Sequence, residues 1–482
     1  MNTAQRIAKN IFSLLFSGVV TEVLGFSAIV YLARVLGPTD FGKINFAMAL
    51  IIYFALVSHL GLPLLGTREI ARCKEKASDY FSNIFVLRLC LASVSFILLL
   101  LFIFLLEKPH EVKILILLYG IGLFFSVLMT DWIFRGIEKM EYIGLGRIVS
   151  AIVYVAFVLL FVRGREQLLL IPCFQIAGSL LAALVLFAIF VKNFGKPKFV
   201  FDLSKFQKIL RRAMPIGFSF FMIQIFYNLD TVMLGFMKSS EDVGIYNVAY
   251  KIIMVLIAFV GLYPDTIFPI FSVYYKNGSL ESLKRFMALS EKLMITLGLP
   301  LTIGGIIVAR PLIITLYGPK YSEGIIAFQI LLLAVLIICF NINYSRGLLA
   351  CNRDILYMAG VTLPAMVNIV SNFLLIPAYG LKGAAVATVL AEITGFLIMY
   401  KGFTNFIKVP FANYVAKPAI ASLMMALFLR AGILWLNMNL ILLIIGAALI
   451  YSASLYLIRG ITKEEINIIK SLLPETFFRQ PT

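Results

Sequence analysis

Ionisable side chains inside long apolar stretches are the residues of this sequence best suited to chemistry. Glu22 stands within one apolar run, Arg88 near the start of another, and Asp230 and Lys251 in two consecutive runs. A charge in lipid is costly, so such groups usually face a wet cavity or a partner. They are therefore the candidates for a substrate-binding or ion-binding site.

The acidic candidates allow more than one role. Asp230 and Lys251 lie on either side of one short turn, and in an antiparallel hairpin they would reach a similar depth and could pair. Such a pair is either an ion-coupling or substrate-contacting site or a locked salt bridge, and the sequence leaves both open. Glu22 is a lone carboxylate near the middle of its run and needs a cation, a proton or water, which favours a place in a cavity.

Arginines supply the second group of candidates. The guanidinium of Arg88 could bind phosphate oxygens in a fork, or it could extend to lipid headgroups. Asp131 and Arg135 are spaced i and i+4, which favours a local ion pair. Arg346 is the repeat equivalent of Arg135, in the motif that parallels the one around Arg135, so an inner gate is one interpretation and interfacial anchoring is the other.

Arg147 and Glu392 are weaker candidates for the same cavity, and nothing in the sequence indicates catalysis. The two histidines, His59 and His110, form no HExxH or Cys/His pattern, so no metal site is expected. No Ser-His-Asp set can be assembled, and phosphate-binding glycine loops are absent. We expect no catalytic residues, no cofactor and no direct use of ATP.

The elements that carry these residues are membrane-spanning helices. The chain is 61% hydrophobic and 14% charged over 482 residues, and its mean hydropathy is +0.99, far above a soluble domain. A span needs roughly 20 apolar residues, and this length picks out about fourteen segments. They are 11–36, 44–65, 84–106, 114–134, 143–162, 168–191, 214–237, 245–271, 293–317, 325–350, 355–376, 383–403, 415–435 and 440–458.

The distribution of positive charge predicts the orientation. With the N-terminus inside, about 29 Lys and Arg fall in the inner connections and about 11 in the outer ones, as the positive-inside rule requires. We therefore expect a multi-pass protein of the inner or plasma membrane with both termini cytoplasmic. The net charge of +18 then matches an anionic inner leaflet, and nucleic acid is not expected as a partner.

Two cassettes of about six spans each are indicated by local repeats, as in many transporters. Gly37 and Gly42 parallel Gly235 and Gly244, and “FRGIEKMEYIGLGRI” parallels “SRGLLACNRDILYMAG”. The expected domains are therefore an N-lobe, a basic cytoplasmic linker in which a surface helix is expected, a C-lobe, and two last spans with a cytoplasmic tail. Their bounds are 1–191, 192–213, 214–410 and 411–482.

Four motifs together resemble the polysaccharide-transporter branch of the multidrug/oligosaccharidyl-lipid/polysaccharide exporter superfamily, which includes flippases of the O-antigen and teichuronic-acid type. The motifs are “LGPTDFG”, “NLDTVMLGFMKSSEDVGIYNVAYKI”, “GPKYSEG” and “AYGLKGAAVATVLAE”. The resemblance implies an all-α polytopic membrane protein with two six-helix lobes around a central cavity and two extra C-terminal helices. It also favours Asp230 as a recurring acid.

The same resemblance implies that the cargo is an isoprenoid-diphosphate-linked oligosaccharide. We expect it to be flipped from the inner to the outer leaflet by alternating access of the two lobes, and coupling to H⁺ or Na⁺ through Asp230 or Glu22 is a further hypothesis. The stretch “TEVLGFSAIV” offers Glu22 and no arginine, unlike the related lipid II flippases, which argues against peptidoglycan precursor. Membrane lipids and glycan polymerase machinery are the other partners to consider. The competing functions are a small-cation multidrug extruder and, with weaker support because the outer loops are short, a membrane glycan polymerase or ligase.

Overall fold

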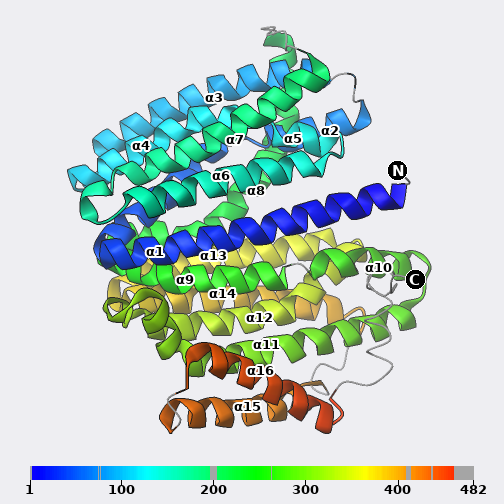
Figure 1. The fold of residues 1–482 in the computed structure, drawn as a ribbon. Coiled ribbons are helices and arrows are strands. Elements are labelled where there is room, and N and C mark those ends of the chain that lie inside the picture. Colours follow the sequence, from blue (N-terminus) through cyan, green and yellow to red (C-terminus); the bar gives the residue numbers. More distant parts are fainter. Residues whose placement is uncertain are drawn as a thin grey trace, which may run out of the picture. The chain divides into compact units, whose positions relative to one another are not determined.

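The computed structural model describes residues 3–73, 75, 77–195, 203–261, 263–408, 414–435 and 438–460. All regular elements in these ranges are helices, which is the expected solution for a chain in lipid because a helix satisfies its own backbone hydrogen bonds. The helices form two compact units, 1–248 and 249–482, here called unit 1 and unit 2 and described separately (Figure 1).

Unit 1 contains eight α-helices and the first turns of α9. They are α1 (Thr3–His59), α2 (Leu62–Arg72), α3 (Ala77–Leu105), α4 (His110–Val127), α5 (Asp131–Gly136), α6 (Met140–Phe161), α7 (Leu170–Phe194), α8 (Leu203–Met237) and α9 (Ser240–Val260), with a short 3₁₀ turn η2 (Arg165–Gln167) before α7. Helix α1 packs against α3, α4, α6 and α8, and α2 packs against α5.

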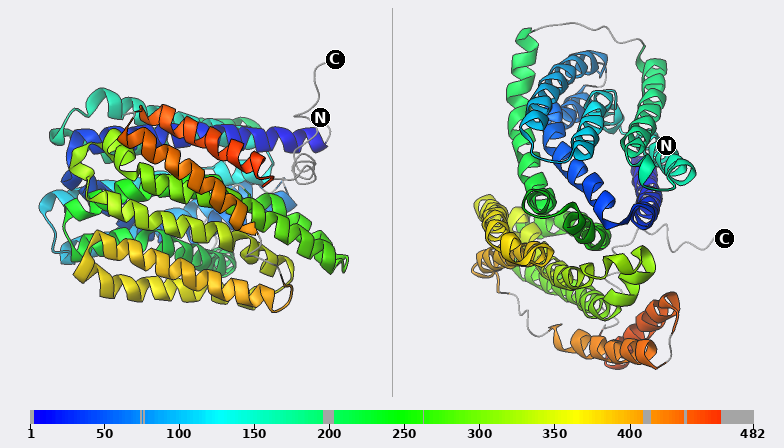
Figure 2. Two further views of the ribbon diagram at one scale, coloured as in Figure 1. Left: turned by 90° about the horizontal axis from the view of Figure 1, so that it is seen from below. Right: turned by 90° about the vertical axis from the view of Figure 1, so that its left-hand side faces the viewer.

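Unit 2 contains the rest of α9 and seven further α-helices. They are α10 (Pro264–Lys276), α11 (Leu280–Tyr317), α12 (Gly324–Ala350), α13 (Asp354–Tyr379), α14 (Leu381–Thr404), α15 (Ala416–Leu434) and α16 (Leu440–Leu457), with the 3₁₀ turn η3 (Pro319–Tyr321) before α12. Helices α11, α12, α14 and α13 pack in that order, and α15 and α16 pack together against α11. Figure 2 shows α15 and α16 as a separate hairpin (orange and red).

The long helix α1 contains two of the expected spans. Its 57 residues are interrupted at Gly37, where φ is 76° and ψ is 175°, and Pro38 follows. A positive φ suits glycine because it has no Cβ, and proline then starts the next helix. The segments expected at 11–36 and 44–65 therefore correspond largely to the two halves of α1, and the second half ends at His59.

Twelve helices of the described chain are long and apolar enough to cross a membrane, or thirteen if α8, bent by 56° between Ile225 and Tyr227, is one span. That count treats α1 as one helix, although the break at Gly37 divides it into two. The all-α, polytopic fold expected from the sequence is confirmed, and the count is consistent with about fourteen spans.

The structure describes only part of the linker expected at 192–213. Residues 196–202 lie outside the described residues. Residues 203–213 do not form a separate surface helix, because they are the first turns of α8. Phe206 is 7% exposed and Ala213 is fully buried in the core that also contains Trp132 and Phe190. Burial of these side chains holds residues 203–213 against the rest of unit 1. The expected lobe boundaries stay a prediction.

Candidate functional site

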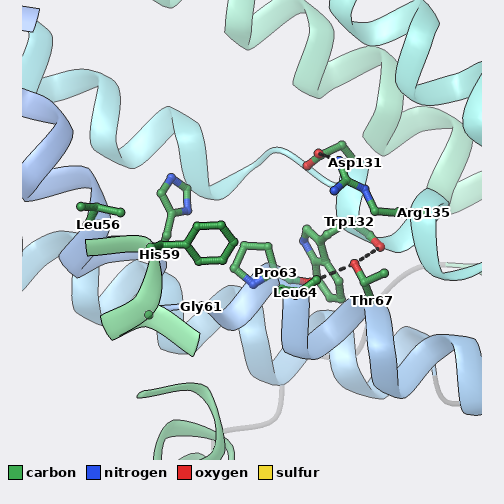
Figure 3. Close-up of a pocket in the computed structure, with 11 residues that line it drawn as sticks. Leu56, His59, Gly61, Pro63, Leu64, Thr67, Asp131, Trp132 and Arg135 are labelled. Atoms are coloured by element: carbon green, nitrogen blue, oxygen red, sulfur yellow. Dashed lines mark hydrogen bonds and ion pairs between the residues drawn. The ribbon is translucent and has the colours of Figure 1, made fainter. Parts of the chain in front are cut away.

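A cleft in unit 1 collects two of the candidate residues. It has a volume of about 250 Å³, and Asp131 and Arg135 lie on its wall with His59, Thr67 and Trp132 (Figure 3). The remaining lining residues are Leu56, Gly61, Pro63, Leu64, Gly217 and Phe220. Its wall is therefore largely apolar, with a few polar groups at defined places, which is the usual composition of a ligand site.

Two breaks in the helices create the cleft. Leu60 and Gly61 adopt positive φ values of 37° and 74°, which ends α1 and turns the chain into α2. Residues 128–130 separate α4 from α5. A Cβ on Gly61 would lie 2.7 Å from the Gly217 backbone nitrogen, so this turn and α8 approach closely because both positions are glycine.

Side chains from α2 and α5 fix the cleft wall. The hydroxyl of Thr67 donates to the carbonyl of Trp132 at 2.9 Å, and it also lies 3.0 Å from the carbonyl of Pro63. A side chain at Gly66 would overlap the Trp132 ring. The ring is 3% exposed and holds α5 against α2. The position of Asp131 and Arg135 therefore depends on this packing.

The ion pair expected from the i, i+4 spacing of Asp131 and Arg135 is present. Arg135 Nη2 lies 3.8 Å from Asp131 Oδ2, and the side chains are 45% and 36% exposed. Because the pair is long and solvated, it costs little to open. The Arg135 guanidinium is therefore able to turn to an anionic ligand in the cleft. Whether Arg135 anchors at the interface or forms a gate with Arg346 stays a prediction.

Arg88 takes a position that neither expected role included. It is 2% exposed, and its guanidinium donates to the carbonyls of Ser126 at 2.7 Å and of Val127 and Met129 at 3.4 Å. These groups lie at the end of α4, where carbonyls lack helical partners and the helix dipole is negative. Arg88 thus caps α4 from α3, and it does not extend to headgroups.

Arg88 also connects this cap to the cleft. Its Nη2 lies 2.8 Å from Nδ1 of His59, and because arginine only donates, Nδ1 is the acceptor in this bond. Of the three guanidinium nitrogens of Arg88, Nε has no partner among the described residues. The guanidinium is therefore largely used in holding the break between α4 and α5, and a contact between Arg88 and substrate stays a prediction.

Asp230 is buried in the α8–α9 hairpin. It is 4% exposed and accepts a hydrogen bond from the Tyr246 hydroxyl at 2.8 Å. Next to it, Asn247 Nδ2 donates to Thr231 Oγ1 at 3.3 Å. Lys251 belongs to unit 2, so the pairing expected between Asp230 and Lys251 joins the two units and stays a prediction.

The other candidates are not among the residues that line the cleft. Glu22 and Arg147 are exposed in unit 1, on α1 and α6, and neither has a hydrogen bond or ion pair with the described residues. Arg346 is half-buried on α12 of unit 2, and Glu392 is buried on α14. No group of three His, Cys, Asp or Glu suited to a metal lies among the residues that were described.

Sequence reasoning missed an ion network in unit 1, in which Lys43 and Asp40 are buried, Glu111 is partly exposed and Arg165 is exposed. Lys43 Nζ lies 2.7 Å from Asp40 and 2.6 Å from Glu111, and Arg165 contacts both acids at 3.3 Å. The network joins α1, α4 and η2. The motif “LGPTDFGK” supplied the signal, because it places an acid and a base three residues apart after a glycine that breaks the helix.

The same motif contains a glycine contact across the repeat. A Cβ at Gly42 would overlap the Ser240 carbonyl, and a Cβ at Gly244 would overlap the Pro38 carbonyl. The turn within α1 and the turn between α8 and α9 therefore touch backbone to backbone. Gly42 and Gly244, one of the two glycine pairs that indicated a sequence repeat, are thus also in spatial contact.

Comparison with known proteins identifies relatives of the chain. A family described as polysaccharide biosynthesis protein matches residues 7–274, more than half of the chain. A putative O-antigen transporter of Escherichia coli (strain K12) is 22% identical over 379 residues, which cover 77% of this chain and 90% of the relative. The resemblance stated from the four motifs is confirmed by these matches.

Solved structures show the same fold. The lipid II flippase MurJ in an inward closed conformation superposes with a TM-score of 0.75 at 17% identity, covering 92% of this chain and 97% of the other. An inward-facing multidrug resistance MATE family transporter of the MOP superfamily gives a TM-score of 0.68 at 15% identity, covering 83% and 99%. At these identities the likeness establishes the fold.

Proposed function

Because the chain belongs to the polysaccharide biosynthesis protein family, we propose that it is a flippase that moves an isoprenoid-diphosphate-linked oligosaccharide from the inner to the outer leaflet of the cell membrane. The chain is a multi-pass membrane transporter and not an enzyme. The observation that carries the cargo class is the family match together with its relative, named as a putative O-antigen transporter. The distribution of Lys and Arg supports a cytoplasmic position for both termini.

The cleft of unit 1 supports a role in binding the charged end of this cargo. Arg135 is half exposed on its wall and is held only by a long ion pair, and a guanidinium suits a diphosphate because it donates in a fork. A volume of about 250 Å³ accommodates part of a headgroup, and the isoprenoid stays in lipid. We assign Arg135 to the headgroup and Asp131 to its release.

Movement by alternating access is supported by the glycine contact between α1 and the α8–α9 turn. Gly42 and Gly244 bring two backbones together, and a contact without side chains can separate at low cost. Opening of this contact would expose the opposite side of the membrane in the second half of the cycle. Coupling to H⁺ or Na⁺ through Asp230 or Glu22 completes the proposal.

A cell assay tests the function. The gene is expressed in a bacterium that lacks its own O-antigen flippase, and O-antigen on the cell surface is measured. We expect surface glycan to return, to fall at least several-fold with Arg135→Gln, and to be unchanged with Arg430→Gln, whose side chain is exposed on α15.

The shared fold with a multidrug resistance transporter makes export of small cations the second candidate. The same strain is therefore tested for susceptibility to cationic drugs. Increased drug resistance without surface glycan would reject the flippase proposal and support the second candidate.

A further inference from the structure

A buried carboxyl of unit 2 has no role in the cleft. Glu291 on α11 is fully buried and accepts a hydrogen bond at 2.9 Å from Nδ2 of Asn343 on α12, which is also fully buried. The pair lies next to the aromatic core that contains Met287 and Tyr344. Residue 291 precedes the apolar run expected at 293–317, so the sequence alone placed it in a polar connection.

The pair is incomplete as a hydrogen-bonded unit. Oε1 of Glu291 and Oδ1 of Asn343 are buried, and neither has a partner among the described residues. Glu291 also forms no ion pair with a described basic side chain. A buried carboxylate without a cation is costly, and a buried acceptor without a donor adds to that cost.

The described residues around Glu291 offer no compensating charge. The titratable groups close enough to feel the charge of Glu291 are the hydroxyl of Tyr263 before α10 and, on α12, the Cys339 thiol and the Tyr344 hydroxyl. On α16, Tyr451 donates to the carbonyl of Thr296, farther along α11. These groups are all neutral at physiological pH. Lys292 is the next residue on α11 itself and has its own partners.

One proton would neutralise the carboxylate of Glu291 and supply the donor that its Oε1 and Oδ1 of Asn343 lack. We propose that Glu291 is a proton-binding site, with the proton on Oε1 and donated to Oδ1 of Asn343. The acid and the amide then form a closed pair of hydrogen bonds, one in each direction, because each group supplies one donor and one acceptor. The proton is transferred from hydronium in the aqueous phase to Oε1, which leaves water, and the reverse transfer restores the carboxylate.

This site deepens the proposed function, and its role in transport rests on that function. Glu291 belongs to unit 2 and is not among the residues that line the cleft of unit 1, so it can bind a proton while the headgroup occupies that cleft. Release of the proton leaves two buried acceptors facing each other, which favours rearrangement of α11 against α12. Exchange of the proton on Glu291 then contributes to coupling of the cycle to a proton gradient, alongside the coupling proposed for Asp230 or Glu22.

Infrared difference spectroscopy of the purified full-length protein during a pH titration tests the site itself. We expect a band from a protonated carboxyl that is absent in Glu291→Gln and shifted in Asn343→Leu. Glutamine can form the same two hydrogen bonds with Asn343, so Glu291→Gln should remain folded. Glu392→Gln, which changes the other buried carboxyl of unit 2, should leave the Glu291 band in place.

Two results would overturn the proposal. One is an unchanged spectrum of protonated carboxyls in folded Glu291→Gln. The other is binding of Na⁺, measured by calorimetry with NaCl alone, that is present in the wild type and lost in Glu291→Gln, because the unpartnered oxygens would then be cation ligands.

Transport gives a separate readout. In the glycan assay we expect Glu291→Gln to lose most of its dependence on external pH. If the infrared band is assigned to Glu291 and no glycan is transported even by the wild type, the proton site stands and the proposed function fails. If glycan is transported and the band is absent, the proposed function stands and the proton site fails.

Discussion

Unit 1 and unit 2 differ in the partners of their buried charged groups. In unit 1, Lys43 is paired with Asp40 and Glu111, and Arg88 donates to carbonyls at the end of α4 and to His59. In unit 2, Glu291 and Glu392 are buried and form no ion pair with described residues. Paired charges hold a fixed arrangement, whereas a lone carboxyl can change its charge by one proton. This difference fits the two proposed roles, which are headgroup recognition in unit 1 and proton coupling in unit 2.

The largest effect is expected from removing the cap of α4 in unit 1. Arg88→Met leaves three carbonyls and His59 Nδ1 without their donor. We expect a loss of about 3 kcal/mol in stability, because hydrogen bonds to a charged group are lost and buried acceptors remain. Thermal unfolding of the detergent-solubilised protein measures it, with Arg88→Lys intermediate. Equal stability of Arg88→Met and wild type would contradict the assigned cap.

The glycine contact is the next test. Gly42→Ala should cost about 1–3 kcal/mol, because its Cβ meets the backbone of Ser240. Gly25→Ala on the same helix α1 meets no atom within 4 Å and should be neutral or slightly stabilising. Thermal unfolding of both variants checks the pair. The contact would be unimportant for unit 1 if the two variants behaved alike.

A smaller effect is expected in unit 2. Asn343→Leu removes the donor to Glu291 and should cost about 1–2 kcal/mol. Adding Glu291→Leu should recover much of that loss, since two apolar side chains replace an unsatisfied pair. A double-mutant cycle of unfolding temperatures provides the measurement. Additive losses in the double variant would show that the two side chains do not act together.

The smallest effect on stability belongs to the cleft. Asp131→Asn breaks a long and half-exposed ion pair and should change stability by less than about 1 kcal/mol. Surface glycan should nevertheless change, because Arg135 loses the partner that competes with the headgroup. Comparison of unfolding temperature with surface glycan separates the two readouts. A large loss of stability would show that the pair is structural.

The sequence predicted the helices well because their signal is local. The run expected at 143–162 corresponds to α6 (Met140–Phe161), and the spacing of Asp131 and Arg135 predicted their ion pair. The role of Arg88 could not be predicted in this way, because it depends on where α4 ends and on which carbonyls then lie beside α3. That information comes from the tertiary structure.

The burial of Lys43 and Glu291 could not be predicted from the sequence either. Both follow polar residues near the edge of an apolar run, so sequence reasoning placed them in connections. The structure buries both, Lys43 against two acids and Glu291 against an amide. Hydropathy reports the average over a run, whereas the partner of a single charge is set by packing between helices.

Transfer of a lipid-linked oligosaccharide across a bilayer by the purified protein tests the account most directly. The protein is reconstituted in liposomes that contain a labelled isoprenoid-diphosphate-linked oligosaccharide in both leaflets, and the sugar is then exposed to a membrane-impermeant oxidant. We predict that all of the label becomes accessible with the protein and only the outer-leaflet fraction without it. Protection of the inner-leaflet fraction in the presence of folded protein would contradict the account.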